Sequence, residues 1–119
     1  MNNNIECPAE RAIYFLGGKW KIRILFYLFK NEKVRFNKLK KELKTITQQM
    51  LSKQLKELEF DGIINRKVYQ VVPPKVEYSL TDFGFSVIPI LKSFSDWNKK
   101  NTRTITQKLN KNFEENRIR

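Results

Sequence analysis

The sequence predicts a mainly α-helical fold with one small β-hairpin, an α+β arrangement, on three observations. Apolar residues recur at helical spacing in several segments, the spacing changes to strict alternation between residues 64 and 80, and Gly, Pro or Asp-Gly signals separate the segments. The 119 residues are one domain's worth of length. With 40% hydrophobic residues, the chain can bury a core that a disordered polycation cannot.

Four helices are expected in the first half of the chain, at about residues 8–16, 20–29, 37–44 and 48–60. Pro8 fits the first helical position, and Gly17-Gly18 supplies a left-handed stop for the first helix. Val34-Arg35 is expected as a very short strand before the third helix. Thr47 is the predicted N-cap of the fourth helix, and Asp61-Gly62 is a strong stop and turn signal after it.

Alternating apolar residues then predict two strands, at 64–69 and 75–80, whose loop contains Pro73 and Pro74. Thr81 is expected to cap a long fifth helix that begins at Asp82 and keeps helical apolar spacing as far as Trp97, and Pro89 should bend or break it locally. Apolar residues every four positions predict a weak terminal helix further on. We therefore divide the chain into a domain at residues 1–100 and a basic C-terminal tail at residues 101–119.

The composition excludes several classes of function. Histidine is absent, so a Ser-His-Asp triad, a Cys-His pair and an imidazole metal site are excluded. One cysteine cannot form a disulfide framework or a zinc cage. We therefore expect no catalytic residues, metal or cofactor, and the chain is not predicted to be an enzyme. Without a long apolar stretch or a signal-peptide layout, we expect no membrane partner and a cytoplasmic location.

The positive charge is concentrated in the middle of the chain. The net charge is +12, and residues 19–75 carry 15 basic and 5 acidic side chains, a net of +10. A folded domain with this charge fits a polyanionic partner, and double-stranded DNA is the first candidate.

The fourth helix has two separate faces. At about 100° per residue from Gln48, its polar side chains fall between about 0° and about 140°, and its leucines between about 280° and about 340°. Gln amides, a Ser hydroxyl and lysines can read base edges in the major groove, although a solvated amphipathic helix shows the same pattern. The candidate DNA-recognition residues are Thr47, Gln48, Gln49, Ser52, Lys53 and Lys56.

A helix pair followed by a basic hairpin is the order of a winged helix-turn-helix, in which the hairpin, or wing, contacts backbone or minor groove. The basic and polar side chains around this motif are candidates for phosphate contact, which positions a protein without reading sequence. They are Arg35, Asn37, Lys38, Arg66, Lys67 and Lys75.

The motifs resemble those of the HxlR-type bacterial regulators, related to the MarR group, over about residues 7–98. They are Cys7-Pro8, GGKWK at 17–21, RFNKL at 35–39, MLSKQLKELE at 50–59, DGII at 61–64 and VPPKVEYSLT at 72–81. The resemblance implies a homodimeric transcription regulator that binds an inverted repeat, with dimer contacts from the first and last helices. Relatives usually carry Gly where this chain has Thr45, and many carry a basic residue where it has Gln49, so we expect a different target sequence.

The fifth helix independently favours a homodimer. Its apolar side chains offer more surface than a small core can cover, unless all of them pack onto the chain's own core. The candidate dimer-interface residues are Phe83, Val87, Ile90, Leu91, Phe94 and Trp97.

The single thiol, Cys7, is the candidate redox sensor. It precedes Pro8 at a helix N-terminus, where the helix dipole favours negative charge, and several relatives sense electrophiles or oxidants at this position. The alternative is an inert, partly buried cysteine. Two other functions stay open: a non-specific architectural nucleic-acid-binding protein, and a regulator switched by a small apolar effector at the dimer junction.

Overall fold

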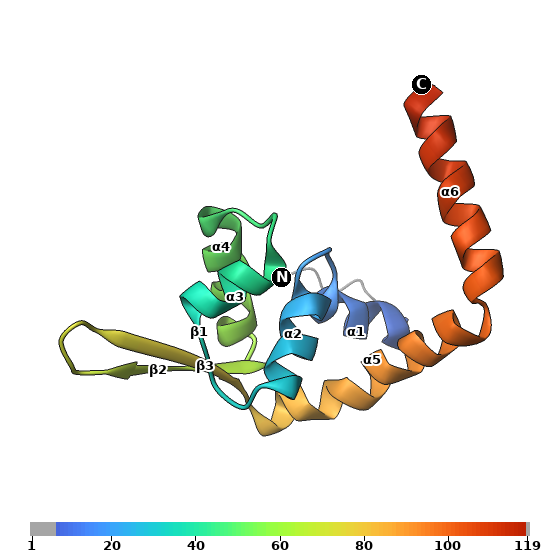
Figure 1. Cartoon of the computed structure of the whole chain (residues 1–119). Helices are drawn as coiled ribbons and strands as arrows, with labels where there is room; N and C mark the ends of the chain where they lie inside the picture. The colour runs from blue at the N-terminus through green and yellow to red at the C-terminus, as the bar shows by residue number, and fades with distance from the viewer. Residues whose placement is uncertain (1–6, 119) are drawn as a thin grey trace. The chain divides into compact units, whose positions relative to one another are not determined.

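Six helices and three strands make up the described part of the chain in the computed structural model, residues 7–118, with side chains described over 7–114 (Figure 1). In chain order they are α1 (Pro8–Leu16), α2 (Lys21–Lys30), β1 (Val34–Arg35), α3 (Phe36–Leu43), α4 (Gln48–Phe60), β2 (Ile64–Tyr69), β3 (Lys75–Leu80), α5 (Asp82–Lys100) and α6 (Thr102–Ile118). The chain divides into two compact units, one ending at Ile88 and the other beginning at Pro89. No helix among these residues has the length and apolar character needed to cross a bilayer.

The core of the first unit is built from one apolar face of each of three helices. Helical spacing brings the leucines and isoleucines of each face into one stripe, and each such side chain gains about 1.5–3 kcal/mol when it is buried. The stripes consist of Ile24, Leu25 and Leu28 on α2, Leu39 and Leu43 on α3, and Leu51, Leu55 and Leu58 on α4.

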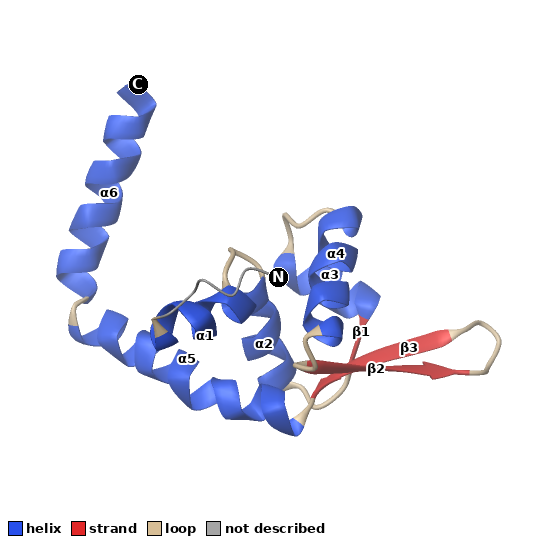
Figure 2. Cartoon of the chain, turned by 180° about the vertical axis from the view of Figure 1, so that it is seen from behind, coloured by secondary structure: helices blue, strands red, loops and turns tan. Residues whose placement is uncertain are grey.

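The expected hairpin is present and gains a third strand. The sheet is antiparallel in the order β1-β3-β2, with Val34 opposite Tyr78 and Ile64 opposite Leu80. Ile64, Tyr78 and Leu80 are buried at the base of the hairpin, whereas most of β2 beyond Ile64 is exposed. Figure 2 shows β2 and β3 projecting away from α3 and α4 of the first unit.

Two threonines cap the starts of α4 and α5, as the sequence predicts. The Thr47 hydroxyl oxygen accepts a hydrogen bond from the Met50 N–H at 3.1 Å, at the start of α4. The Thr81 oxygen accepts from the Gly84 N–H at 2.9 Å at the start of α5. The Thr81 O–H also faces the carbonyl oxygens of Gly62 and Ile63, at 2.6 and 3.0 Å. One hydroxyl therefore ties the start of α5 to the turn that follows α4.

Two details of the helices differ from expectation. Gly17 is extended (φ −62°), and the left-handed residue after α1 is Gly18 (φ +106°). The helix α5 continues through Pro89, so a break at that proline is wrong. Proline costs the helix one backbone hydrogen bond because it has no N–H donor. Burial of Ile88 and Leu91, which are 2% and 1% exposed, stabilises the helix on both sides of the proline and outweighs that loss. The terminal helix expected in the tail is present as α6.

Candidate nucleic-acid interface

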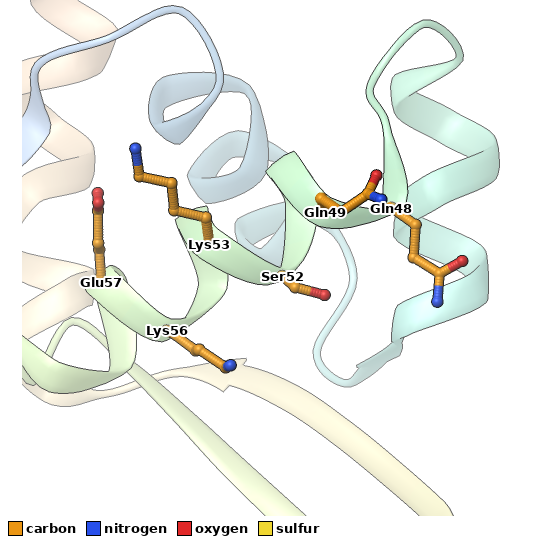
Figure 3. Close-up of a pocket in the computed structure, with 6 residues that line it drawn as sticks. All are labelled: Gln48, Gln49, Ser52, Lys53, Lys56 and Glu57. Carbon is orange, nitrogen blue, oxygen red and sulfur yellow. The ribbon is translucent and has the colours of Figure 1, made fainter.

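The polar face of α4 lines an open hollow of about 710 Å³ (Figure 3). Lys53 and Glu57 project from one side of the helix, and Ser52 and Lys56 from another. Thr47, also predicted for this surface, lies just before the helix with its hydroxyl engaged as the N-cap. The hollow therefore gathers five of the six predicted recognition residues: its lining is Gln48, Gln49, Ser52, Lys53, Lys56 and Glu57.

The orientation of α4 follows from its other face. Leu51, Leu55 and Leu58 are 0%, 2% and 0% exposed, so the apolar side of the helix is held in the core. The amides, hydroxyl and ammonium groups then lie on the outward side of the helix, where the glutamines and lysines are exposed and Ser52 is partly exposed. This is the surface chemistry that major-groove reading needs.

A second hollow, of about 380 Å³, lies between α4 and the wing. Arg66 of β2 lines it together with Ser52 and Lys56 of α4, so one predicted wing cation shares a surface with the polar face of α4. The remaining lining residues are Phe36, Leu55, Glu59 and Tyr78.

The two wing lysines are organised by an aromatic ring and a carboxylate. The ammonium groups of Lys67 and Lys75 each lie 4.8 Å from the centroid of the Tyr69 ring. Lys75 Nζ also lies 3.3 Å from Glu77 Oε1. Desolvation raises the pKa of Glu77, but hydrogen bonds from Tyr69 and Lys75 and the charges of Lys75 and Lys33 outweigh it and lower that pKa. Lys75 is therefore partly neutralised within the wing, which the sequence did not indicate.

The other predicted phosphate contacts lie at the start of α3. Arg35 is the N-cap residue of α3, and Asn37 and Lys38 are in its first turn; all three are exposed, outside the two hollows. In the turn that follows α3, Lys44 has φ +56°. The residue with positive φ is thus Lys44. It lies one position before Thr45, where the resembling family usually carries glycine.

Sequence reasoning missed a link between α4 and the body of the first unit. Lys21 Nζ lies 2.8 Å from Glu57 Oε2, and the Lys21 side chain is only 8% exposed. The hydrogen bond from Lys21 lowers the pKa of Glu57, against the opposing effect of desolvation, and the charges of Lys21 and Lys53 add to the lowering. Lysines are rarely buried, so the sequence predicted an exposed side chain at Lys21. Nothing in the GGKWK motif indicates that this lysine pairs with Glu57, 36 residues further along the chain.

The six predicted dimer-interface residues divide into two groups. Val87 and Leu91 are 8% and 1% exposed and are buried within one chain. The other four are exposed, and a hollow of about 490 Å³ on the second unit is lined by three of them with Ser93. Those four are Phe83, Ile90, Phe94 and Trp97, at 54%, 51%, 57% and 62% exposed.

Cys7 is exposed and occupies the N-cap position of α1, without a side-chain capping hydrogen bond. It is not part of a metal site within the described residues, which contain no group of three or more His, Cys, Asp or Glu side chains that could hold an ion. The thiol is therefore open to reagents in solution.

Comparison with known families decides the class. A family model described as HxlR-like helix-turn-helix matches residues 15–106. The chain belongs to the HxlR family. This HxlR member is 50% identical over 94 residues to the HTH-type transcriptional regulator YdeP of Bacillus subtilis (strain 168), covering 79% of the chain and 73% of YdeP.

Solved structures agree with this family. The redox regulator HypR in its reduced form matches with a TM-score of 0.80 and 42% identity, over 85% of this chain and 99% of HypR. Diamide-treated YodB from B. subtilis matches with a TM-score of 0.68 and 32% identity, over 81% of this chain and 95% of YodB. The predicted winged-helix fold and the class of helix-turn-helix transcriptional regulator, rather than enzyme, are confirmed.

Proposed function

We propose that this HxlR member binds an inverted-repeat operator in double-stranded DNA as a homodimer, with α4 in the major groove and the wing on the backbone or minor groove. The observation that carries the proposal is the outward polar face of α4, where Gln48, Gln49 and Ser52 stand beside Lys53 and Lys56. Gln side chains pair bidentately with adenine, and lysines contact guanine or phosphate.

A second copy of the chain is the proposed cover for the exposed face of α5. Ile90, Phe94 and Trp97 are each more than half exposed, which is costly for large apolar side chains in water. A twofold dimer would place two recognition helices about 34–36 Å apart, in successive major grooves. Sedimentation of the wild type and of the double variant F94S/W97S tests this proposal. We expect a dimer for the wild type and a monomer for the variant. A variant that is still a dimer would contradict it.

The DNA test begins with an operator that the protein itself selects from a random duplex library. Affinity for this operator and for a scrambled duplex is then compared at fixed salt. We expect a preference of at least about a thousandfold. A preference of tenfold or less would instead favour a non-specific architectural protein.

The salt dependence tests the phosphate contacts. If each protomer neutralises about four phosphates, log affinity should fall against log salt with a slope near −7. A slope shallower than about −3 would contradict the assignment. Lys38→Met should weaken all duplexes alike and reduce the slope by about 1, whereas Gln48→Ala should change the preferred base.

Thiol oxidation at Cys7 is the proposed regulatory input, supported by its exposure and by the likeness to the redox regulators HypR and YodB. Diamide takes up two hydrogens as two thiols join in a disulfide. With one cysteine in the sequence, that bond must join two chains or one chain and a small thiol. We expect diamide to change operator affinity of the wild type and not of Cys7→Ser. A Cys7→Ser protein that responds equally would exclude this input.

A further inference from the structure

Lys21 has an unusual environment for a lysine. It is the first residue of α2. Among the residues whose side chains the structure describes, it is the one charged residue that is buried, at 7% exposure. A buried ammonium group is stable only with a close partner. The partner is Glu57, with Nζ and Oε2 2.8 Å apart.

The two ends of this ion pair lie in different surroundings. The Lys21 side chain is 8% exposed, whereas the Glu57 side chain is 42% exposed and lines the hollow along the polar face of α4. Figure 3 shows the Glu57 carboxylate projecting beside Lys53. The pair therefore connects the interior of the first unit to the surface that is proposed to meet DNA.

Two physical effects follow from this arrangement. The leucine stripe of α4 holds the helix by apolar packing, which is non-directional, whereas a charge-assisted hydrogen bond restrains its direction. A carboxylate near DNA also repels phosphate, and the Lys21 ammonium offsets that charge. A glutamate is ionised at neutral pH, and the hydrogen bond from Lys21 lowers the pKa of Glu57 further, so the pair is intact there.

We propose that the Lys21–Glu57 ion pair positions α4 for operator recognition and neutralises the carboxylate that α4 presents to DNA, which makes Lys21 a positioning residue for sequence discrimination. This inference rests on the proposed function and concerns the same surface.

The first test compares Glu57→Gln with Glu42→Gln, which removes an equal charge from an exposed position on α3. The readout is the ratio of affinity for the selected operator to affinity for the scrambled duplex. Both variants gain similar non-specific affinity from the lost negative charge. Glu57→Gln should lower the ratio by about tenfold, and Glu42→Gln should leave it within about twofold. If the ion pair only stabilised the fold, its loss would leave this affinity ratio unchanged in protein that is still folded.

The reciprocal test removes the lysine. Lys21→Met should lower operator affinity by about tenfold and Lys30→Met, at the exposed end of the same helix, by less than about threefold. Adding Glu57→Gln to Lys21→Met should restore affinity to within about threefold of Glu57→Gln alone, because no unpaired carboxylate then remains. Circular dichroism establishes that each variant is folded. If Lys21→Met does not fold, the glutamate comparison decides alone.

The outcomes separate the two proposals. A wild-type ratio of about tenfold or less would overturn the proposed function and this inference with it. A large wild-type ratio that Glu57→Gln and Glu42→Gln change equally would overturn this inference and leave the proposed function standing.

Discussion

Replacing Gly84 with alanine should destabilise the protein, although alanine favours helix. Gly84 is buried near the start of α5, and its N–H donates to the Thr81 hydroxyl. A Cβ added there would overlap the carbonyl oxygen of Ile63 and lie 3.2 Å from Leu80 Cδ2. The overlapped group is backbone, so no rotamer change can relieve the contact, and the start of α5 must move away from Ile63.

The size of the effect follows from three contributions. Alanine gains about 1 kcal/mol of helix propensity over glycine, while overpacking costs about 1–3 kcal/mol. Moving α5 also weakens the bonds between Thr81 and the Ile63 carbonyl, each worth about 0.5–1.5 kcal/mol. The net loss of unfolding free energy is about 2 kcal/mol. In a chain of this size that lowers Tm by about 6–10 °C.

Thermal and urea unfolding, followed by circular dichroism, measure this change. Asn98→Ala, at an exposed position of the same helix, is the control and should change unfolding free energy by no more than about 0.5 kcal/mol. A Gly84→Ala protein that melts at or above the wild-type temperature would refute the close approach of α5 to Ile63.

Three further changes test the first unit. Thr47→Ala should cost about 1 kcal/mol of unfolding free energy because α4 loses its N-cap, with Thr47→Ser near wild type in urea unfolding. Leu55→Ala should cost about 2–5 kcal/mol of unfolding free energy because Leu55 is buried. Phe60→Ala, at a side chain that is 92% exposed, should cost less than about 0.5 kcal/mol. Equal losses of unfolding free energy in the two variants would contradict the burial of Leu55. The pKa of Glu57 is lowered in the folded state, so its stabilisation is present at neutral pH and lost as the pH falls below 4.5 through the folded value. Unfolding from pH 7 to 3 should show a smaller decline in Lys21→Met than in wild type.

Local signals explain why so much of the fold could be predicted. Pro8 and Thr47 mark the starts of α1 and α4, and both helices have the predicted bounds. The change to alternation at Ile64 marks the start of the wing, although β2 is exposed beyond Ile64 and Val68 is 50% exposed. Each of these signals depends on neighbours in sequence, so it predicts the type and bounds of an element without knowledge of its packing.

The missed features depend on contacts between distant segments. The pairing of Lys21 with Glu57 is set by how α2 and α4 pack, which the periodicity of each helix does not report. The continuation of α5 through Pro89 likewise reflects burial of neighbouring residues outweighing one lost hydrogen bond. The surface of α4 was predictable because an amphipathic helix separates its polar and apolar faces by sequence alone.

The order β1-β3-β2 leaves β2 bonded to a neighbour on one side only within the described sheet. An open strand edge is a template on which another chain can add, and natural proteins protect such edges with charge. Arg66 and Lys67, exposed on β2, supply that charge. We therefore expect the two cations proposed to meet phosphate also to keep the wings of neighbouring molecules from pairing into an aggregating sheet. Neutralising both should reduce solubility as well as DNA affinity, and a loss of binding in such a variant must be measured on protein shown to be monodisperse.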